Sequence, residues 1–115
     1  MVSVIVPLFN EEKNLRLLFE KIYSVLSKQA WDFEVIFIND GSTDDSASVL
    51  DFLEKDYSDI IRSFHLLRNY GQTAAMSAGI DESQYDIIVP MDADLQNDPN
   101  DIPALVEKLQ EGYDI

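Results

Sequence analysis

Short apolar runs alternate with helical patterns along most of the chain, and this alternation restricts the fold more than any other feature. Four runs have the length and apolar character of buried strands: residues 2–6, 33–38, 60–67 and 86–91. Strands that alternate with helices form a mainly parallel sheet, with helices on both faces and right-handed crossovers. The sequence therefore predicts an α/β domain of this kind.

Four helices are expected between and after these strands. The first, over about 12–28, repeats apolar residues at i, i+3, i+4 and i+7, with Asn10 as the expected N-cap. The second, over about 44–55, is expected to be capped by Ser42 or Thr43. A short Ala-rich helix follows at 72–80, and a last one has Pro103 in its first turn and ends at Gly112.

Composition narrows the classes of function. The 115 residues suit one domain, and 46% apolar with 26% charged residues is typical of a globular protein. A formal charge of -14 argues against nonspecific nucleic-acid binding and against a polybasic membrane patch. A phosphorylated ligand would be repelled unless a divalent cation bridged it. The absence of cysteine excludes a disulfide framework and a Cys-based zinc site.

Polar side chains follow three of the expected strands. Glu11 comes after the first strand and Asp40 after the second, while the fourth runs into Asp92, Asp94 and Gln96. The carboxyl ends of parallel strands lie along one edge of a sheet, where open α/β folds bind their ligands. We therefore expect the four acids to share one crevice.

The Asp92-x-Asp94 pair beside Gln96 has the donor chemistry of a Mg²⁺ or Mn²⁺ site. Two acids at the end of a buried strand repel each other and lose hydration, and a cation removes both problems. Plainer explanations remain, because Asp pairs are common in turns. Similarly, Asp40 fits a simple turn, and Glu11 fits the first turn of a helix.

Several other chemistries have no support. His65 is the only histidine, and it is expected to be a packed or edge residue of the third strand. Trp31 is expected to be a packing anchor. Neither Ser42 nor Ser77 has a histidine partner for a hydrolase triad. The sequence contains neither GxxxxGK[ST] nor GxGxxG, so it has no P-loop and no dinucleotide fingerprint.

Four segments, in order and at matching spacing, resemble the family 2 glycosyltransferases. They are Pro-Leu-Phe-Asn-Glu-Glu at 7–12, Asn-Asp-Gly-Ser-Thr-Asp at 39–44, Arg-Asn-Tyr-Gly-Gln at 68–72 and Asp-Ala-Asp-Leu-Gln at 92–96, with Asp-Pro at 98–99. The third and fourth segments are similar to the branch that acts on polyprenyl phosphates. The resemblance covers essentially the whole chain and implies a Rossmann-like GT-A fold.

The resemblance also implies residue roles in binding a nucleoside diphosphate sugar. The implied nucleotide-sugar-binding residues are Pro7, Phe9, Glu11, Ile38, Asp40, Asp92 and Ala93. Within this set, Ile38 and Asp40 would contact the base and ribose region. Asp92 and Ala93 would lie near the ribose and the sugar diphosphate.

For the reaction, the resemblance implies inverting sugar transfer assisted by Mg²⁺ or Mn²⁺. Asp94 and Gln96, with Asp92 beside them, are the implied metal ligands, and Asp94 is the implied catalytic residue. The implied acceptor is a polyprenyl phosphate, which is already ionised and has less need of a general base.

Residues 113–115 resemble the start of a fifth strand, so we expect residues 1–115 to be the nucleotide-sugar-binding part of a longer chain. We expect this part to hold donor and metal without being fully competent. The full-length protein is expected at the cytoplasmic face of the membrane. Two alternatives stay open: a non-catalytic nucleotide-sugar-binding module, and a receiver-like signalling domain, although no Lys follows a strand as a receiver requires.

Overall fold

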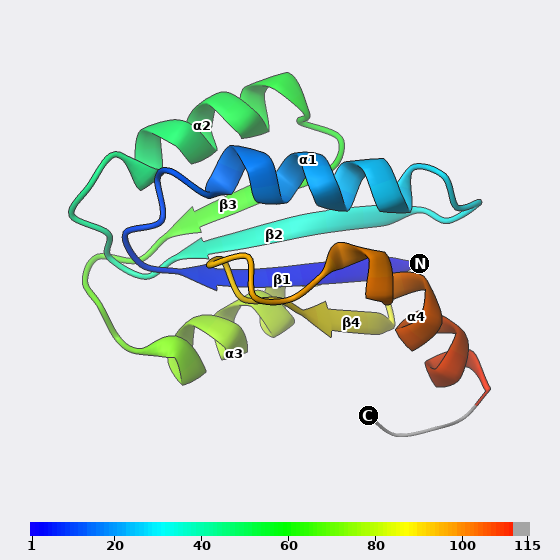
Figure 1. Ribbon diagram of the computed structural model, residues 1–115. Helices are drawn as coiled ribbons and strands as arrows, with labels where there is room; N and C mark the ends of the chain where they lie inside the picture. The colour runs from blue at the N-terminus through cyan, green and yellow to red at the C-terminus, as the bar shows by residue number, and fades with distance from the viewer. Residues whose placement is uncertain (112–115) are drawn as a thin grey trace.

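A four-stranded parallel sheet forms the centre of the computed structural model, which describes residues 1–111 (Figure 1). The strands are β1 (Val2–Leu8), β2 (Phe33–Asn39), β3 (Ile61–His65) and β4 (Ile87–Pro90), in the order β3-β2-β1-β4. The two longest strands, β1 and β2, pair in the middle and end together at Leu8 and Asn39. The predicted parallel α/β sheet is confirmed.

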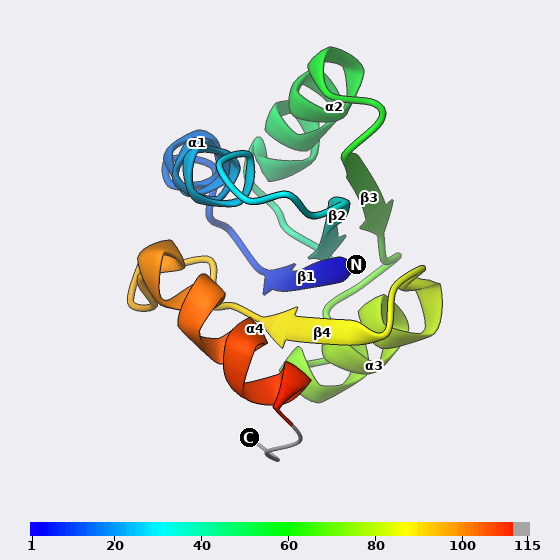
Figure 2. The ribbon, with the colours of Figure 1, turned by 90° about the vertical axis from the view of Figure 1, so that its right-hand side faces the viewer.

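Helices cover both faces of this sheet, as expected (Figure 2). The helices are α1 (Leu15–Leu26), α2 (Ser46–Asp56), α3 (Gln72–Glu82) and α4 (Ile102–Gln110), with the short 3₁₀ turn η1 (Pro99–Asp101) before α4. Apolar residues of α1, α2 and α4 join one core cluster, and Ala75 of α3 joins the other. None of these helices combines the length and apolar character that a membrane span requires.

The alternation of side chains along β1 explains why its sequence is apolar apart from Ser3, which is itself buried. Val4 and Val6 point into the larger core beneath α1 and α2, whereas Ile5 points into the smaller core beneath α3. A strand buried on both faces has no solvent side, so it shows no polar alternation. Fully burying each such side chain contributes about 1.5–3 kcal/mol.

Gly79 allows α3 to approach the sheet closely. A Cβ atom at this position would overlap Cγ2 of Ile5 and lie 3.3 Å from Cγ1 of Ile38. The small residues of α3 therefore serve close helix-sheet packing.

The loops after β1 and β2 brace each other, and this differs from the expected caps. Asn10 has φ 55° and does not cap α1, which begins only at Leu15. Its Oδ1 accepts hydrogen bonds from the N–H groups of Thr43 (2.8 Å) and Asp44 (3.2 Å), and its own N–H donates to Ser42 Oγ (2.9 Å). The prediction that Asn10, Ser42 or Thr43 caps a helix is wrong, because these groups bond across the two loops.

Asp44 completes the brace from the other side. Its carboxylate accepts from the N–H of Ser46 (2.9 Å) and from the N–H of Glu12 (3.3 Å), while Ser46 Oγ accepts from Glu11 N–H (3.0 Å). Burial acts to raise the pKa of Asp44, but the hydrogen bonds from Ser46 and Glu12 outweigh it and leave the pKa below its ordinary value.

The remaining boundaries shift by a few residues. Strand β3 is shorter than the expected run 60–67, and α2 begins at Ser46 rather than at residue 44. The last helix is preceded by η1, where Asp98 accepts from the N–H of Asn100 (2.9 Å). Gly112 as a helix stop and the fifth strand at 113–115 lie outside the described residues.

Replacing Gly79 by alanine should destabilise the protein. A Gly to Ala change inside a helix ordinarily gains about 1 kcal/mol, but overpacking a core costs about 1–3 kcal/mol. Urea unfolding should show a net loss for Gly79→Ala and none for Ser77→Ala, which adds no atoms at an exposed position of α3. Equal stability of the two variants would contradict the close packing described above.

Removing the carboxylate of Asp44 should have a pH-dependent effect. Because the folded pKa is lowered, the stabilisation is fully present above the unfolded pKa of about 4 and is lost as the pH falls through the folded pKa. Urea unfolding of Asp44→Asn should show a loss of about 1 kcal/mol at pH 7, shrinking at pH 3.

The matched control is Asp45→Asn, at the neighbouring position, whose side chain makes no capping hydrogen bond. It should behave as the wild type at both pH values. A stability difference for Asp44→Asn that stayed constant with pH would show that its carboxylate charge is not what holds the brace.

Candidate functional site

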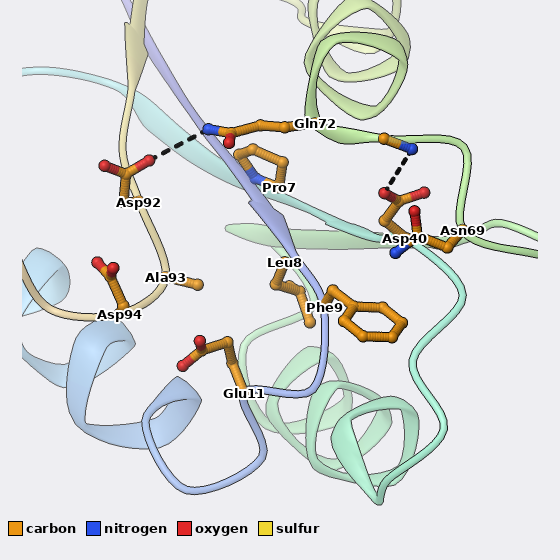
Figure 3. A pocket seen from close by; sticks show the side chains of 11 residues that line it. Pro7, Leu8, Phe9, Glu11, Asp40, Asn69, Gln72, Asp92, Ala93 and Asp94 are labelled. Carbon is orange, nitrogen blue, oxygen red and sulfur yellow. Dashed lines mark hydrogen bonds between the residues drawn. The ribbon is translucent and has the colours of Figure 1, made fainter.

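A cavity of about 240 Å³ opens at the carboxyl edge of the sheet. Its lining comes from the ends of β1, β2 and β4 and from the start of α3 (Figure 3). The lining residues are Pro7, Leu8, Phe9, Glu11, Asp40, Asn69, Gly71, Gln72, Asp92, Ala93 and Asp94. The edge that the sequence predicts as the ligand site is therefore hollowed.

The segment after β1 contributes an aromatic ring and an acid. Phe9 is 43% exposed although it follows a fully buried strand, and its ring borders the cavity (Figure 3). Glu11 is held by Asn14, whose Nδ2 donates to Glu11 Oε2 at 2.7 Å. The brace between the two loops fixes the backbone on which both side chains stand.

Asp40 forms the part of the lining next to the end of β1. Its buried carboxylate accepts from the N–H of Tyr70 through Oδ1 (2.8 Å) and from the N–H of Gly71 through Oδ2 (3.0 Å). Its own N–H donates to Leu8 O (2.8 Å), so Asp40 joins β1, β2 and the loop before α3. At the next residue, Gly41, φ is 70° and a Cβ atom would overlap the backbone of Arg68, so the loop packs directly on this turn.

The segment after β4 carries the acidic pair. Oδ1 of Asp92 accepts from Nε2 of Gln72 (3.3 Å), and the backbone N–H of Gln96 donates to Oδ1 of Asp94 (3.2 Å). Leu95, between Asp94 and Gln96, has φ 67°, which turns the chain sharply. The carboxylates of Asp92, Asp94 and Glu11 lie on the same side of the cavity (Figure 3).

Two expected site residues are not part of this lining. Ile38 is fully buried beneath α3 in the core, so its side chain does not face the cavity. Gln96 is exposed and borders hollows beside the 95–100 segment instead. The other expected residues, Pro7, Phe9, Glu11, Asp40, Asp92, Ala93 and Asp94, are brought together.

Three lining residues have no role predicted from the sequence, and all belong to the 68–72 segment: Asn69, Gly71 and Gln72. This segment was matched to the family pattern, but nothing local to it indicates where it folds. Its place depends on the long-range bonds to Asp40 and Asp92.

The electrostatics of the lining favour a cation shared with an anionic ligand. Four lining residues are acidic and none is Lys or Arg. Within residues 1–111, no three His, Cys, Asp or Glu side chains converge as a complete metal cage. Mg²⁺ characteristically binds one or two carboxylates and takes its other ligands from water and substrate phosphates. Asp92 and Asp94 fit that arrangement.

Solved structures similar to this chain share its fold. One is the mannosyltransferase PcManGT from Pyrobaculum calidifontis in complex with GDP-Man and Mn²⁺, with a TM-score of 0.75 and 24% identity over 93% of this chain and 31% of that one. Another is S. aureus TarS 1–349 in complex with UDP-GlcNAc, with a TM-score of 0.70 and 24% identity over 96% of this chain and 31% of that one.

Curated relatives are more similar in sequence. A protein named undecaprenyl-phosphate 4-deoxy-4-formamido-L-arabinose transferase is 40% identical in Photorhabdus laumondii (99% of this chain, 35% of the relative). The protein of the same name is 41% identical in Pseudomonas aeruginosa (100% and 34%). The chain thus spans about a third of the length of these relatives.

The family model "Glycosyl transferase family 2" matches residues 3–115. The chain therefore belongs to glycosyl transferase family 2.

Proposed function

We propose that the chain is the donor-binding part of an inverting glycosyltransferase that moves a sugar from a nucleoside diphosphate sugar to a polyprenyl phosphate. The observation that carries this proposal is the cavity at the sheet edge, which combines an exposed aromatic ring with four acids and no basic residue. Family membership supports the reaction class, and the names of the curated relatives support the acceptor.

The nucleotide half of the site would lie between β1 and the 68–71 loop. The Phe9 ring offers a flat apolar surface for a base, beside Pro7. Both carboxylate oxygens of Asp40 are engaged by Tyr70 and Gly71, so Asp40 would act on the base and ribose region with its remaining acceptor capacity. Since Ile38 is buried, it would support this half only from beneath.

The diphosphate half would lie at the end of β4. Asp94 and Asp92 would hold Mg²⁺ or Mn²⁺, and the cation would offset charge on the departing diphosphate. Ala93 lies between them, and its small side chain leaves the cavity open. Gln96 orients Asp94 through its N–H, and its role as a direct ligand rests on the resemblance alone.

The proposed acceptor is a lipid phosphate, and its chemistry determines which groups the reaction needs. An ionised phosphate oxygen is nucleophilic without prior deprotonation, so the cavity would not need a general base beside the sugar. The lipid would bring the complete protein to the cytoplasmic face of the membrane. We infer that residues 1–115 hold donor and cation, and that segments beyond them are required for transfer.

Removing the acidic pair should abolish metal-dependent donor binding. UDP-sugars and GDP-sugars are titrated into the protein from its complete reading frame by calorimetry, with and without Mn²⁺. Asp94→Asn and Asp92→Asn should each weaken binding in Mn²⁺ at least about tenfold, which corresponds to 1.4 kcal/mol.

The matched control is Asp101→Asn, an exposed acid before α4 outside the cavity, and it should bind donor as the wild type does. Donor affinity that is the same with and without Mn²⁺, and that survives Asp94→Asn, would refute the metal assignment. Donor binding without transfer to polyprenyl phosphate in the complete protein would instead favour a non-catalytic binding module.

Truncating the aromatic ring of Phe9 should weaken nucleotide binding by a different route. Phe9→Leu should lower the affinity for UDP or GDP several-fold, both with and without Mn²⁺, because it removes ring contact and leaves the acids in place. Phe52→Leu is the control, since Phe52 is 64% exposed on α2 and lies outside the cavity lining. Equal affinities for the two variants would exclude Phe9 from the base contact.

A further inference from the structure

A buried amide at the end of β2 links the cavity wall to the only histidine. Asn39 is 3% exposed, and its Oδ1 accepts from the N–H of Ser42 (3.1 Å). Its Nδ2 lies 3.0 Å from Nδ1 of His65, at the end of β3. On the far side of the ring, Nε2 of His65 lies 3.1 Å from Oδ1 of Asp51, on α2.

These partners fix which ring nitrogen carries the proton. Because an N–H group occupies Oδ1 of Asn39, the amide presents its NH₂ group to His65, and an NH₂ group only donates. Nδ1 of His65 must therefore accept, without a proton of its own. The ring proton then resides on Nε2 and is donated to Asp51. The neutral ring satisfies both neighbours.

Asn39 connects the segments that form one wall of the cavity. Its carbonyl oxygen accepts from Leu66 N–H (2.9 Å), which joins β2 to the end of β3. The next residue is Asp40, whose carboxylate holds the 70–71 backbone against the cavity. Ser42, which Asn39 holds, receives the N–H of Asn10 and so anchors the loop that carries Phe9 and Glu11.

We propose that His65 is a positioning residue of the donor cavity, acting through Asn39 on Asp40 and the 39–42 turn, and that its protonation weakens donor binding. This rests on the proposed function, because the ligand whose affinity changes is the nucleotide donor. His65 itself does not line the cavity.

A second proton on the His65 ring breaks one hydrogen bond of this network. With Nδ1 protonated, two donors face each other across the 3.0 Å contact with Asn39. Rotating the amide by 180° would present its oxygen to His65 but would turn the NH₂ group onto the N–H of Ser42, again two donors. Either way one donor of these part-buried contacts loses its protein partner, which weakens the link between His65 and the 39–42 turn.

The charged groups around His65 do not replace this contact. Helix α2 packs on β3 and carries Asp51, Glu54 and Lys55 on this stretch. Asp51 can accept from Nε2 whether or not Nδ1 is protonated. Glu54 is committed to Ser63, whose N–H and hydroxyl both donate to it.

The charges on the neighbouring strands are likewise engaged elsewhere. Directly after β2, Asp40 is committed to the N–H groups of Tyr70 and Gly71. On β3 itself, Arg62 pairs with Glu34, toward the opposite end of the sheet. The contact between His65 and Asn39 is therefore the one that a second ring proton disrupts.

The test compares wild type with His65→Gln and His65→Leu in the protein from its complete reading frame. Affinity for UDP and GDP in Mn²⁺ is measured from pH 8.0 to 5.5, the range in which histidine ordinarily changes charge. Gln offers Asn39 a carbonyl acceptor that does not titrate, and Leu offers none. Dividing each wild-type affinity by that of His65→Gln at the same pH cancels titration of the nucleotide and of the acidic ligands.

This ratio should fall roughly three- to tenfold between pH 8.0 and 5.5. His65→Leu should be weakened at every pH. A constant ratio would overturn the proposal, as would a His65→Leu variant that binds like the wild type. Urea unfolding at pH 8.0 verifies that all three proteins are folded under the binding conditions.

A ligand-free readout separates failure of this inference from failure of the proposed function. Amide hydrogen exchange of Ser42, Tyr70 and Gly71, corrected for intrinsic rates, should accelerate at low pH in the wild type relative to His65→Gln. Unchanged relative exchange would overturn the positioning role. Accelerated exchange without any nucleotide binding would support the network and instead contradict the proposed donor site.

Discussion

The carboxylate of Asp40 is the interaction on which the site depends most. It accepts the N–H groups of Tyr70 and Gly71 while its own N–H bonds to Leu8, so one buried residue joins β1, β2 and the loop that leads into α3. A buried carboxylate is stable only when its acceptor capacity is used, and here two backbone amides use it. Without this carboxylate, the N–H groups of Tyr70 and Gly71 would lose their acceptor, and the loop before α3 would no longer be held in place.

The acidity of the cavity fits the proposed diphosphate ligand only if a divalent cation binds with it. Two unit charges 4 Å apart interact by about 4 kcal/mol near a protein surface, so a bare diphosphate would be repelled by Asp92, Asp94 and Glu11. With a divalent cation the same acids become attractive. Under the proposed function, the lining would therefore favour a diphosphate that arrives with a metal ion, since it contains no lysine or arginine.

Strands were predictable from the sequence because burial on both sheet faces leaves a continuous apolar signal, and the order of polar strand ends was predictable with them. The start of α3 at Gln72 was predictable as well, but the starts of α1 and α2 were not. Asn10 and Ser42 have the side chains of N-caps, but they bond to each other's loops, a partnership set by the neighbouring positions of β1 and β2. The place of the 68–72 segment in the cavity wall was not predictable for the same reason. Asp40 and Asp92 hold it from about 20 to 30 residues away in the sequence. Local pattern cannot encode such contacts.

The two halves of the cavity differ in how far they are formed before a ligand arrives. The half near Phe9 and Asp40 is held by bonds between separate loops, and a site organised in advance loses less freedom on binding. The half at Asp92 and Asp94 is held mainly by bonds within its own turn, and its carboxylates repel each other. A ligand that enters with its base first would therefore meet a prepared surface. The cation and diphosphate would then supply the attraction that orders the acidic half.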